Sequence, residues 1–241
     1  MRENCVIATL ETEHSMSKRQ LHTWRLEPEL MTVICGHLDA GRRRHFRKNE
    51  AIYEQGELSS KFFYIEKGLA QVSIIRFDGT EMLLEFMGPH TIIGEGAAFD
   101  YLPRFSCAFA VEDTQAVEFD AERLTEVFRD RPEFASALLR VTSIKQRILA
   151  IRLEHLVSRE PAERILELLQ RLISMFGTEH PNGRILVTKL THEEIAAMTG
   201  TSRVTVTRTF QRMREQNIID MVDGHILIKS QATSGVRPRD S

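Results

Sequence analysis

Residues 191–208, THEEIAAMTGTSRVTVTR, decide the fold of the C-terminal part of the chain. Thr191 and Glu194 have the spacing of a capping box, in which the hydroxyl accepts from the backbone three residues on while the carboxylate reaches back. A short helix is therefore expected to start there. Gly200 then supplies a turn, and Ser202 can cap a second helix. Two short helices joined by a glycine turn predict a helix-turn-helix.

The second helix, from Ser202 to about Glu215, separates apolar from basic residues. Val206, Phe210 and Met213 form a stripe that we expect to be buried. The remaining faces are strongly basic, with no acidic residue between Ser202 and Arg214. The arginines of this segment are Arg203, Arg208, Arg212 and Arg214. Such a cluster predicts a nucleic-acid contact.

The segment after this helix predicts a wing. Residues 218–222 and 225–228 are two short apolar runs, and Asp223-Gly224 between them is a tight-turn signal. A solvated basic face on an ordinary helical hairpin is the alternative. The order of capping box, turn glycine, second cap, arginines and wing argues against it, although any one of these features would be weak alone.

In a helix-turn-helix, the start of the second helix enters the major groove of double-stranded DNA. Arginine can donate two hydrogen bonds to a guanine edge, and valine or threonine can touch a thymine methyl group. The residues predicted to lie at the bases are Arg203, Val204, Thr205, Thr207 and Arg208. Ser202, Thr205 and His192 suit phosphate contacts, which position a domain without reading sequence.

The central part of the chain has a different pattern. From Arg44 to Phe119, short β-type runs alternate with glycines, and Asp78-Gly79 marks a hairpin. This pattern predicts an antiparallel sandwich or barrel. From Ala121 the period becomes helical, and Pro132 separates a short helix from a long one.

The long helix carries an apolar seam at spacings of four and three residues. Its members are Ala137, Val141, Ile144, Ile148, Ile151 and His155. The seam can pack on the β-domain of the same chain or on the equivalent helix of a second chain. The isoleucine-rich heptad spacing favours the second arrangement, so we predict a homodimer that uses Val141, Ile144, Ile148, Ile151 and His155.

Composition excludes several classes of protein. No apolar run approaches the roughly 18 residues that a membrane span needs, so we expect a cytoplasmic protein without a membrane partner. Three scattered cysteines and nine histidines form no metal-ligand spacing, and no hydrolase or nucleotide-loop motif is present. We therefore expect no catalytic residues, no metal and no cofactor. A cupin-type enzyme is disfavoured because His45 and His90 stand far apart.

The order of β-roll, long helix and winged helix-turn-helix resembles the Crp/Fnr family of bacterial regulators. The resemblance covers about residues 40–228, and it rests on Tyr64-Ile-Glu-Lys-Gly68, on Ile93-Gly-Glu95, and on the segments 195–208 and 216–219. It implies an α+β fold: a double-stranded β-roll sensor domain like those that bind cyclic nucleotides, a long dimerisation helix, and a winged helix-turn-helix. The implied domains are a variable arm (1–24), the β-roll (25–131), the helix (132–158), the DNA-binding domain (159–229) and a flexible tail (230–241).

The resemblance also implies which residues read DNA. Arg203, Val204 and Arg208 stand where the family reads bases, but the best-known members have Glu at the position of Val204. Glutamate can accept from a cytosine amino group, whereas valine cannot. We therefore expect an A·T pair opposite Val204.

The implied effector site departs from the family pattern as well. Cyclic-nucleotide binders carry an Arg followed at once by Ser or Thr, whereas here Phe105 takes the Arg position, between Arg104 and Ser106. Along the long helix, Leu149 and Ala150 would meet the base of a nucleotide, and both are apolar. With Glu95, these residues predict a pocket for a hydrophobic or aromatic effector, as in the branch that senses halogenated phenols. A cyclic nucleotide, an unidentified ligand, haem at His90 and a redox switch at Cys5 or Cys35 remain alternatives.

The expected mechanism follows from these parts. An effector bound between the β-roll and the long helix shifts the paired helices, which moves two recognition helices to or from a spacing of about 34 Å on a palindromic operator. The segment His180-Pro-Asn-Gly183 matches the place where family activators touch RNA polymerase. Activation is therefore favoured over repression.

Overall fold

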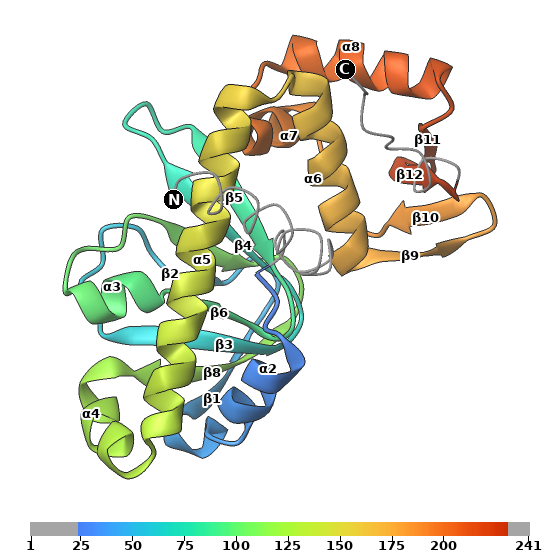
Figure 1. Cartoon of the computed structure of the whole chain (residues 1–241). Coiled ribbons are helices and arrows are strands. Elements are labelled where there is room, and N and C mark those ends of the chain that lie inside the picture. Colours follow the sequence, from blue (N-terminus) through green and yellow to red (C-terminus); the bar gives the residue numbers. More distant parts are fainter. Residues whose placement is uncertain (1–23, 231–241) are drawn as a thin grey trace, which may run out of the picture.

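The computed structural model describes residues 24–230, which form two parts joined by one long helix (Figure 1). The N-terminal part starts with helix α2 (Pro28–Cys35) and a short 3-10 helix η1 (Leu38–Ala40). Strands β1 (Arg42–Phe46), β2 (Ala51–Tyr53), β3 (Lys61–Lys67), β4 (Ala70–Ile75), β5 (Glu81–Met87), β6 (Thr91–Ile93), β7 (Cys107–Ala110) and β8 (Thr114–Asp120) follow, with helix α3 (Glu95–Asp100) between β6 and β7. Most of the predicted arm and tail lies outside the described residues.

The strands form two antiparallel sheets, in the orders β1-β8-β3-β6 and β2-β7-β4-β5. This is the predicted double-stranded β-roll, and the hairpin at Asp78-Gly79 joins β4 to β5 as expected. Strand β3 is buried on both faces: Phe63 and Ile65 pack between the sheets, whereas Phe62 and Tyr64 pack against helices. A strand covered on both sides reads as a continuous apolar run, as β3 does.

Helix α4 (Ala121–Asp130) and the long helix α5 (Pro132–Ser158) follow the roll, with Pro132 in the first turn of α5 as predicted. The prediction that the seam meets a second chain is wrong for Val141, Ile148 and His155. These residues are only 3%, 1% and 7% exposed in the single chain. Ile144 and Ile151 are half-buried. The spacing defines an apolar face but not what covers it, and other parts of the same chain cover this one, as the core of the roll covers Val141.

A different apolar face of α5 is exposed. Its members are Leu139, Leu149, Leu153, Leu156 and Val157. Leu149, Leu153 and Leu156 are separated by four and three residues, which keeps them on one side of the helix. Helix α5 therefore has two apolar faces, of which its own chain covers one.

The C-terminal part contains helix α6 (Pro161–Phe176), strands β9 (Gly177–His180) and β10 (Gly183–Leu186), helices α7 (His192–Thr199) and α8 (Arg203–Glu215), and strands β11 (Ile219–Val222) and β12 (His225–Lys229). The strands pair in the order β11-β12-β10-β9. Residues 177–180, which lead into the segment matched to the RNA polymerase contact, pair with β10. This polar strand has no apolar alternation by which the sequence could reveal it.

The predicted wing is the β11–β12 hairpin. Asp223 (φ 51°) and Gly224 (φ 80°) both have left-handed backbones, as a two-residue turn of this type requires. The core of this domain also takes in Leu69, Leu83 and Phe86 from the roll, so β5 contacts the C-terminal domain. In the part of the chain that the structure describes, no helix combines the length and apolar character needed to cross a membrane.

Candidate functional site

Helices α7 and α8 form the predicted helix-turn-helix. The Thr191 hydroxyl accepts from the Glu194 amide at 3.2 Å, and the Glu194 carboxylate accepts from the Thr191 amide at 2.6 Å, so the capping box is present. Gly200 ends α7 in a left-handed conformation (φ 61°). The Ser202 hydroxyl accepts from the Thr205 amide at 3.1 Å and caps α8. Local hydrogen bonds thus fix both helix starts and the turn between them.

The faces of α8 are divided as the sequence predicts. Val206, Phe210 and Met213 are at most 5% exposed and pack in the domain core. On the opposite faces, Arg203, Val204, Thr207 and Arg208 are exposed, and Thr205 is half-buried. Val204 is 58% exposed, so core packing does not account for a β-branched residue in this first turn. The first turn and a half of α8 is free to contact a ligand.

His192 links the two helices of the motif. Its Nδ1 lies 2.9 Å from the Thr207 hydroxyl, which itself donates to the Arg203 carbonyl at 3.0 Å. The imidazole ring also lies 4.9 Å from the ring of Phe210. These contacts hold the start of α7 against α8. The phosphate contact predicted for His192 stays a prediction.

The β-roll brings together three of the predicted effector residues. Glu95, the first residue of α3, is buried, and its carboxylate accepts from Lys145 Nζ at 2.5 Å. Arg104 is 3% exposed and donates to the carbonyls of Lys61 and Gly94 at 2.6 and 3.2 Å, so it is part of the interior of the roll. Ser106 is also buried, with its hydroxyl 3.5 Å from the Tyr53 hydroxyl.

Arg104 is held by two further contacts. Its guanidinium carbon lies 4.4 Å from the centroid of the Tyr53 ring, and its Nε lies 3.6 Å from the Glu57 carboxylate. Burial raises the pKa of Tyr53 to about 12, so the phenol stays neutral beside this cation. Two of the five N–H donors of Arg104 are therefore used in hydrogen bonds within the protein.

The other predicted effector residues do not join this group. Phe105 is 67% exposed, Leu149 is 55% exposed, and Ala150 is exposed too. In the single chain, Leu149 and Ala150 do not face the roll, and their predicted contact with an effector stays a prediction. Lys145 and Arg152 occupy that position instead, because Ile148 between them is the buried residue of this turn.

Sequence reasoning missed a buried ion cluster centred on Glu85 of β5. Glu85 is 3% exposed, and its Oε2 lies 2.6 Å from Arg152 Nη2 on α5, 3.3 Å from Arg171 Nη1 on α6, and 2.8 Å from Trp24 Nε1. Desolvation raises the pKa of this carboxyl, but the charges of Arg171 and Arg152 outweigh it and hold the pKa below its usual value. A single carboxylate inside the apolar run Met82–Met87 was the available signal.

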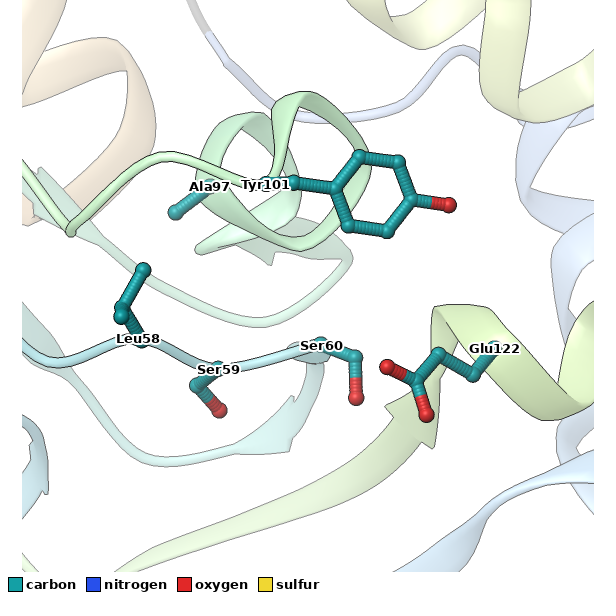
Figure 2. Close-up of a pocket in the computed structure, with 6 residues that line it drawn as sticks. All are labelled: Leu58, Ser59, Ser60, Ala97, Tyr101 and Glu122. Carbon is teal, nitrogen blue, oxygen red and sulfur yellow. The ribbon is translucent and has the colours of Figure 1, made fainter.

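A hollow of about 390 Å³ lies elsewhere on the roll, between α3 and the start of α4 (Figure 2). Leu58, Ser59, Ser60, Ala97, Tyr101 and Glu122 line it. Figure 2 shows the Tyr101 ring on the opposite side of the space from Leu58–Ser60. None of the predicted effector residues lines this hollow, so it is separate from the predicted effector site.

The residues proposed for haem or redox sensing have protein partners. His90 Nδ1 lies 2.8 Å from the Tyr64 hydroxyl, which is also 3.2 Å from the Cys35 sulfur. Cys35 is exposed, and Cys5 lies outside the described residues. Within residues 24–230, no group of three or more His, Cys, Asp or Glu side chains could hold a metal ion.

In a comparison with known proteins, each of the two parts of the chain matches a known domain family. Residues 43–131 match the cyclic nucleotide-binding domain, and residues 163–232 match the Crp-like helix-turn-helix domain. The chain is 30% identical over 194 residues to a CRP-like cAMP-activated global transcriptional regulator of Mycobacterium tuberculosis, covering 80% of this chain and 87% of that protein. It is 26% identical to the cyclic AMP receptor protein of Thermus thermophilus, covering 86% and 91% of the two chains.

Solved structures have the same fold. The global regulator CLP of Xanthomonas campestris, described as responsive to c-di-GMP, has a TM-score of 0.69 at 18% identity, covering 83% of this chain and 99% of its own. CprK complexed with OCPA has a TM-score of 0.64 at 24% identity, covering 86% and 93%. In such regulators the first domain binds an effector and the second binds DNA. The chain belongs to the Crp/Fnr family of transcriptional regulators.

Proposed function

We propose that this regulator is a homodimer that reads a palindromic operator with the start of α8 and responds to an effector bound between the β-roll and α5. The exposed, capped first turn of α8 is the observation that carries the proposal. Arg203 and Arg208 have no ion-pair partner among residues 24–230, so their guanidinium groups are available for guanine edges or phosphates.

The exposed apolar face of α5 supports the dimer. Leu149, Leu153 and Leu156 lie on one side of a helix that is 27 residues long, which suits pairing with the same helix of a second copy. A two-fold pair of winged domains places two recognition helices on successive turns of DNA, about 34 Å apart. The operator is then a palindrome.

A selection from random duplex DNA tests this proposal. The purified protein is incubated with a pool of duplexes, bound duplexes are recovered and amplified, and the enriched sequences are read. We expect a palindrome with half-site centres about 10 base pairs apart. Enrichment of single, non-repeated sites would contradict the dimeric arrangement, and the absence of any enriched sequence would contradict sequence-specific binding.

For the effector we propose a small aromatic compound. Lys145 and Arg152, which replace the expected apolar residues, both lie beside the single tryptophan, so this part of the roll already accommodates an aromatic ring. A cyclic nucleotide is the second candidate, because the M. tuberculosis relative is named as cAMP-activated. Against it, Arg104 already donates to two carbonyls.

Thermal unfolding distinguishes the two candidates. A ligand at 100 times its dissociation constant adds about 2.7 kcal/mol to the free energy of unfolding. We expect stabilisation by members of a panel of phenols and aromatic acids, and none by cyclic AMP. Stabilisation by cyclic AMP alone would overturn the aromatic assignment.

We also propose that the regulator activates transcription through the β9–β10 turn at His180–Gly183. The turn connects two strands at the edge of the C-terminal sheet, on a different element from α8. Replacing Pro181-Asn182 by Gly-Gly is expected to leave operator affinity unchanged and to abolish activation in a purified transcription system with RNA polymerase. Unchanged activation would count against this surface.

A further inference from the structure

Trp24 occupies an aromatic slot between two cations. Its ring centroid lies 4.8 Å from the guanidinium carbon of Arg152 and 5.5 Å from Nζ of Lys145, both on α5. The indole NH donates to Glu85 at 2.8 Å, and the ring packs at the margin of the core between the two sheets. The chain contains no other tryptophan. The slot thus selects a flat ring by packing and by cation–π contacts.

The cations around this slot exceed the carboxylates that neutralise them. Lys145 is paired with Glu95, whereas Arg152 and Arg171 share the single carboxylate of Glu85. Glu167, the other carboxylate near Arg171, accepts from Arg159 at 3.0 Å and lies 3.0 Å from His155. The cluster of Glu85, Arg152 and Arg171 therefore carries one positive charge in excess.

Two N–H donors of this cluster have no acceptor. The Nε atoms of Arg152 and Arg171 are buried and lack a hydrogen-bond partner. The side chain of Arg171 is only 9% exposed, so this donor is largely removed from bulk solvent. Desolvation lowers the pKa of Arg171 despite the attraction of Glu85, as expected for a buried cation with too little counter-charge.

We propose that this slot binds an aromatic monoanion, whose ring takes the place of the Trp24 indole and whose anionic oxygens accept from Arg152 and Arg171. The ring is recognised by the space between Arg152 and Lys145, and the charge is recognised by the excess cation. In the absence of ligand, Trp24 fills the slot as an internal plug. Trp24 and the ligand therefore compete for one position.

The inference rests on the proposed function, in which an effector regulates the protein from a site between the β-roll and α5. It specifies the chemical class of that effector and the residue that competes with the effector for its site. Arg171 belongs to α6 of the DNA-binding domain, Arg152 to α5, and Glu85 to the roll. A ligand that draws the two arginines toward its own anion weakens their shared contact with Glu85. The occupant of the slot is thus coupled to the contact that joins the roll to the DNA-binding domain.

The test uses the variant Trp24→Ala, which empties the slot. The probe is indole-3-acetate, because it carries the same indole ring as the side chain that was removed. Calorimetry should show that indole-3-acetate binds Trp24→Ala at least tenfold more tightly than it binds wild type. Neutral indole and non-aromatic cyclohexylacetate should each bind this variant at least tenfold more weakly than indole-3-acetate. Adding Arg152→Met should reduce the affinity at least tenfold, whereas Arg147→Met, an exposed arginine on the same helix, should not.

A second measurement does not depend on the stability of the variant. Phenylacetate does not absorb where tryptophan is excited, so its binding to wild type can be followed by the emission of Trp24. We expect a saturable shift of the emission to the red as the indole leaves the slot for water. Equal binding of indole and indole-3-acetate to Trp24→Ala, or a phenylacetate titration without any emission change, would overturn the proposal. Neither ligand-binding measurement uses DNA. If the protein selects a palindromic operator but these measurements fail, only the proposed ligand site is refuted.

Discussion

Two groups of arginines in this protein differ in their exposure and in their partners. Arg203 and Arg208 on α8 are exposed and have no ion-pair partner among the described residues. Arg104, Arg152 and Arg171, in contrast, are wholly or largely buried and bind carbonyls or Glu85. The first group is close together in sequence, whereas the second comes from β-roll, α5 and α6. The exposed arginines are available for DNA, whereas Arg152 and Arg171 join α5 and α6 to the roll through Glu85.

Helix α5 shows the same contrast between its two faces. Lys145, Ile148 and Arg152 contact the roll, whereas Leu149 and Leu153 are exposed. The double change Leu149→Glu with Leu153→Glu should convert the dimer to a monomer, because it places carboxylates in the apolar face that we propose as the dimer interface. Sedimentation should show the monomer, and specific operator binding should be lost altogether.

The control for this experiment is Leu102→Glu, an exposed leucine on the roll. It should leave both the dimer and operator binding intact. A dimer that survives the double change would show that the exposed face of α5 is not the interface.

The buried group is tested by Glu85→Gln. The change leaves Arg152 and Arg171 without a counter-charge, and breaking a buried ion pair from one side costs about 3 to 5 kcal/mol in the free energy of unfolding. Chemical denaturation at pH 7 measures this loss. Glu81→Gln, an exposed residue on the same strand, should change stability by less than about 0.5 kcal/mol.

Glu85 also predicts a pH dependence. Its pKa in the folded protein lies below the ordinary value of 4.5, so its ionised form contributes stability fully above pH 4.5 and loses that contribution as the pH falls below it. The wild-type protein should therefore lose stability below pH 4.5 more steeply than Glu85→Gln. Parallel curves for the two proteins would mean that Glu85 is not held ionised by the arginines.

The substitution Val204→Glu tests which base pair the exposed start of α8 reads. The valine methyl groups can contact a thymine methyl, whereas a glutamate accepts from a cytosine amino group, and such a contact contributes about 1 to 3 kcal/mol. The base pair opposite position 204 should change from A·T in wild type to G·C in the variant, with little change at other positions. Competition binding with operator variants measures this preference. A wild-type preference for G·C would contradict the assignment.

The difference between the two groups also explains how much the sequence predicts. Thr191, Gly200 and Ser202 act on backbone atoms within a few residues, so the helix-turn-helix follows from local rules. The surroundings of Glu85 depend on residues that are 61 to 86 positions away in the sequence, namely Trp24, Arg152 and Arg171, and no local pattern indicates such a contact. For the same reason, the face of α5 that the roll covers could not be identified from spacing alone.

Operator binding by the double variant Arg203→Ala with Arg208→Ala tests whether the start of α8 reads DNA, because this variant lacks the two exposed guanidinium groups there. Fluorescence anisotropy at one fixed salt concentration should compare this variant with wild type and with Arg129→Ala, an exposed arginine on α4. The double variant should lose about 30-fold or more in affinity for the selected operator, since each bidentate base contact contributes about 1 to 3 kcal/mol. Its thermal unfolding and the affinity of Arg129→Ala should remain those of wild type. An unchanged operator affinity in the double variant would contradict the account.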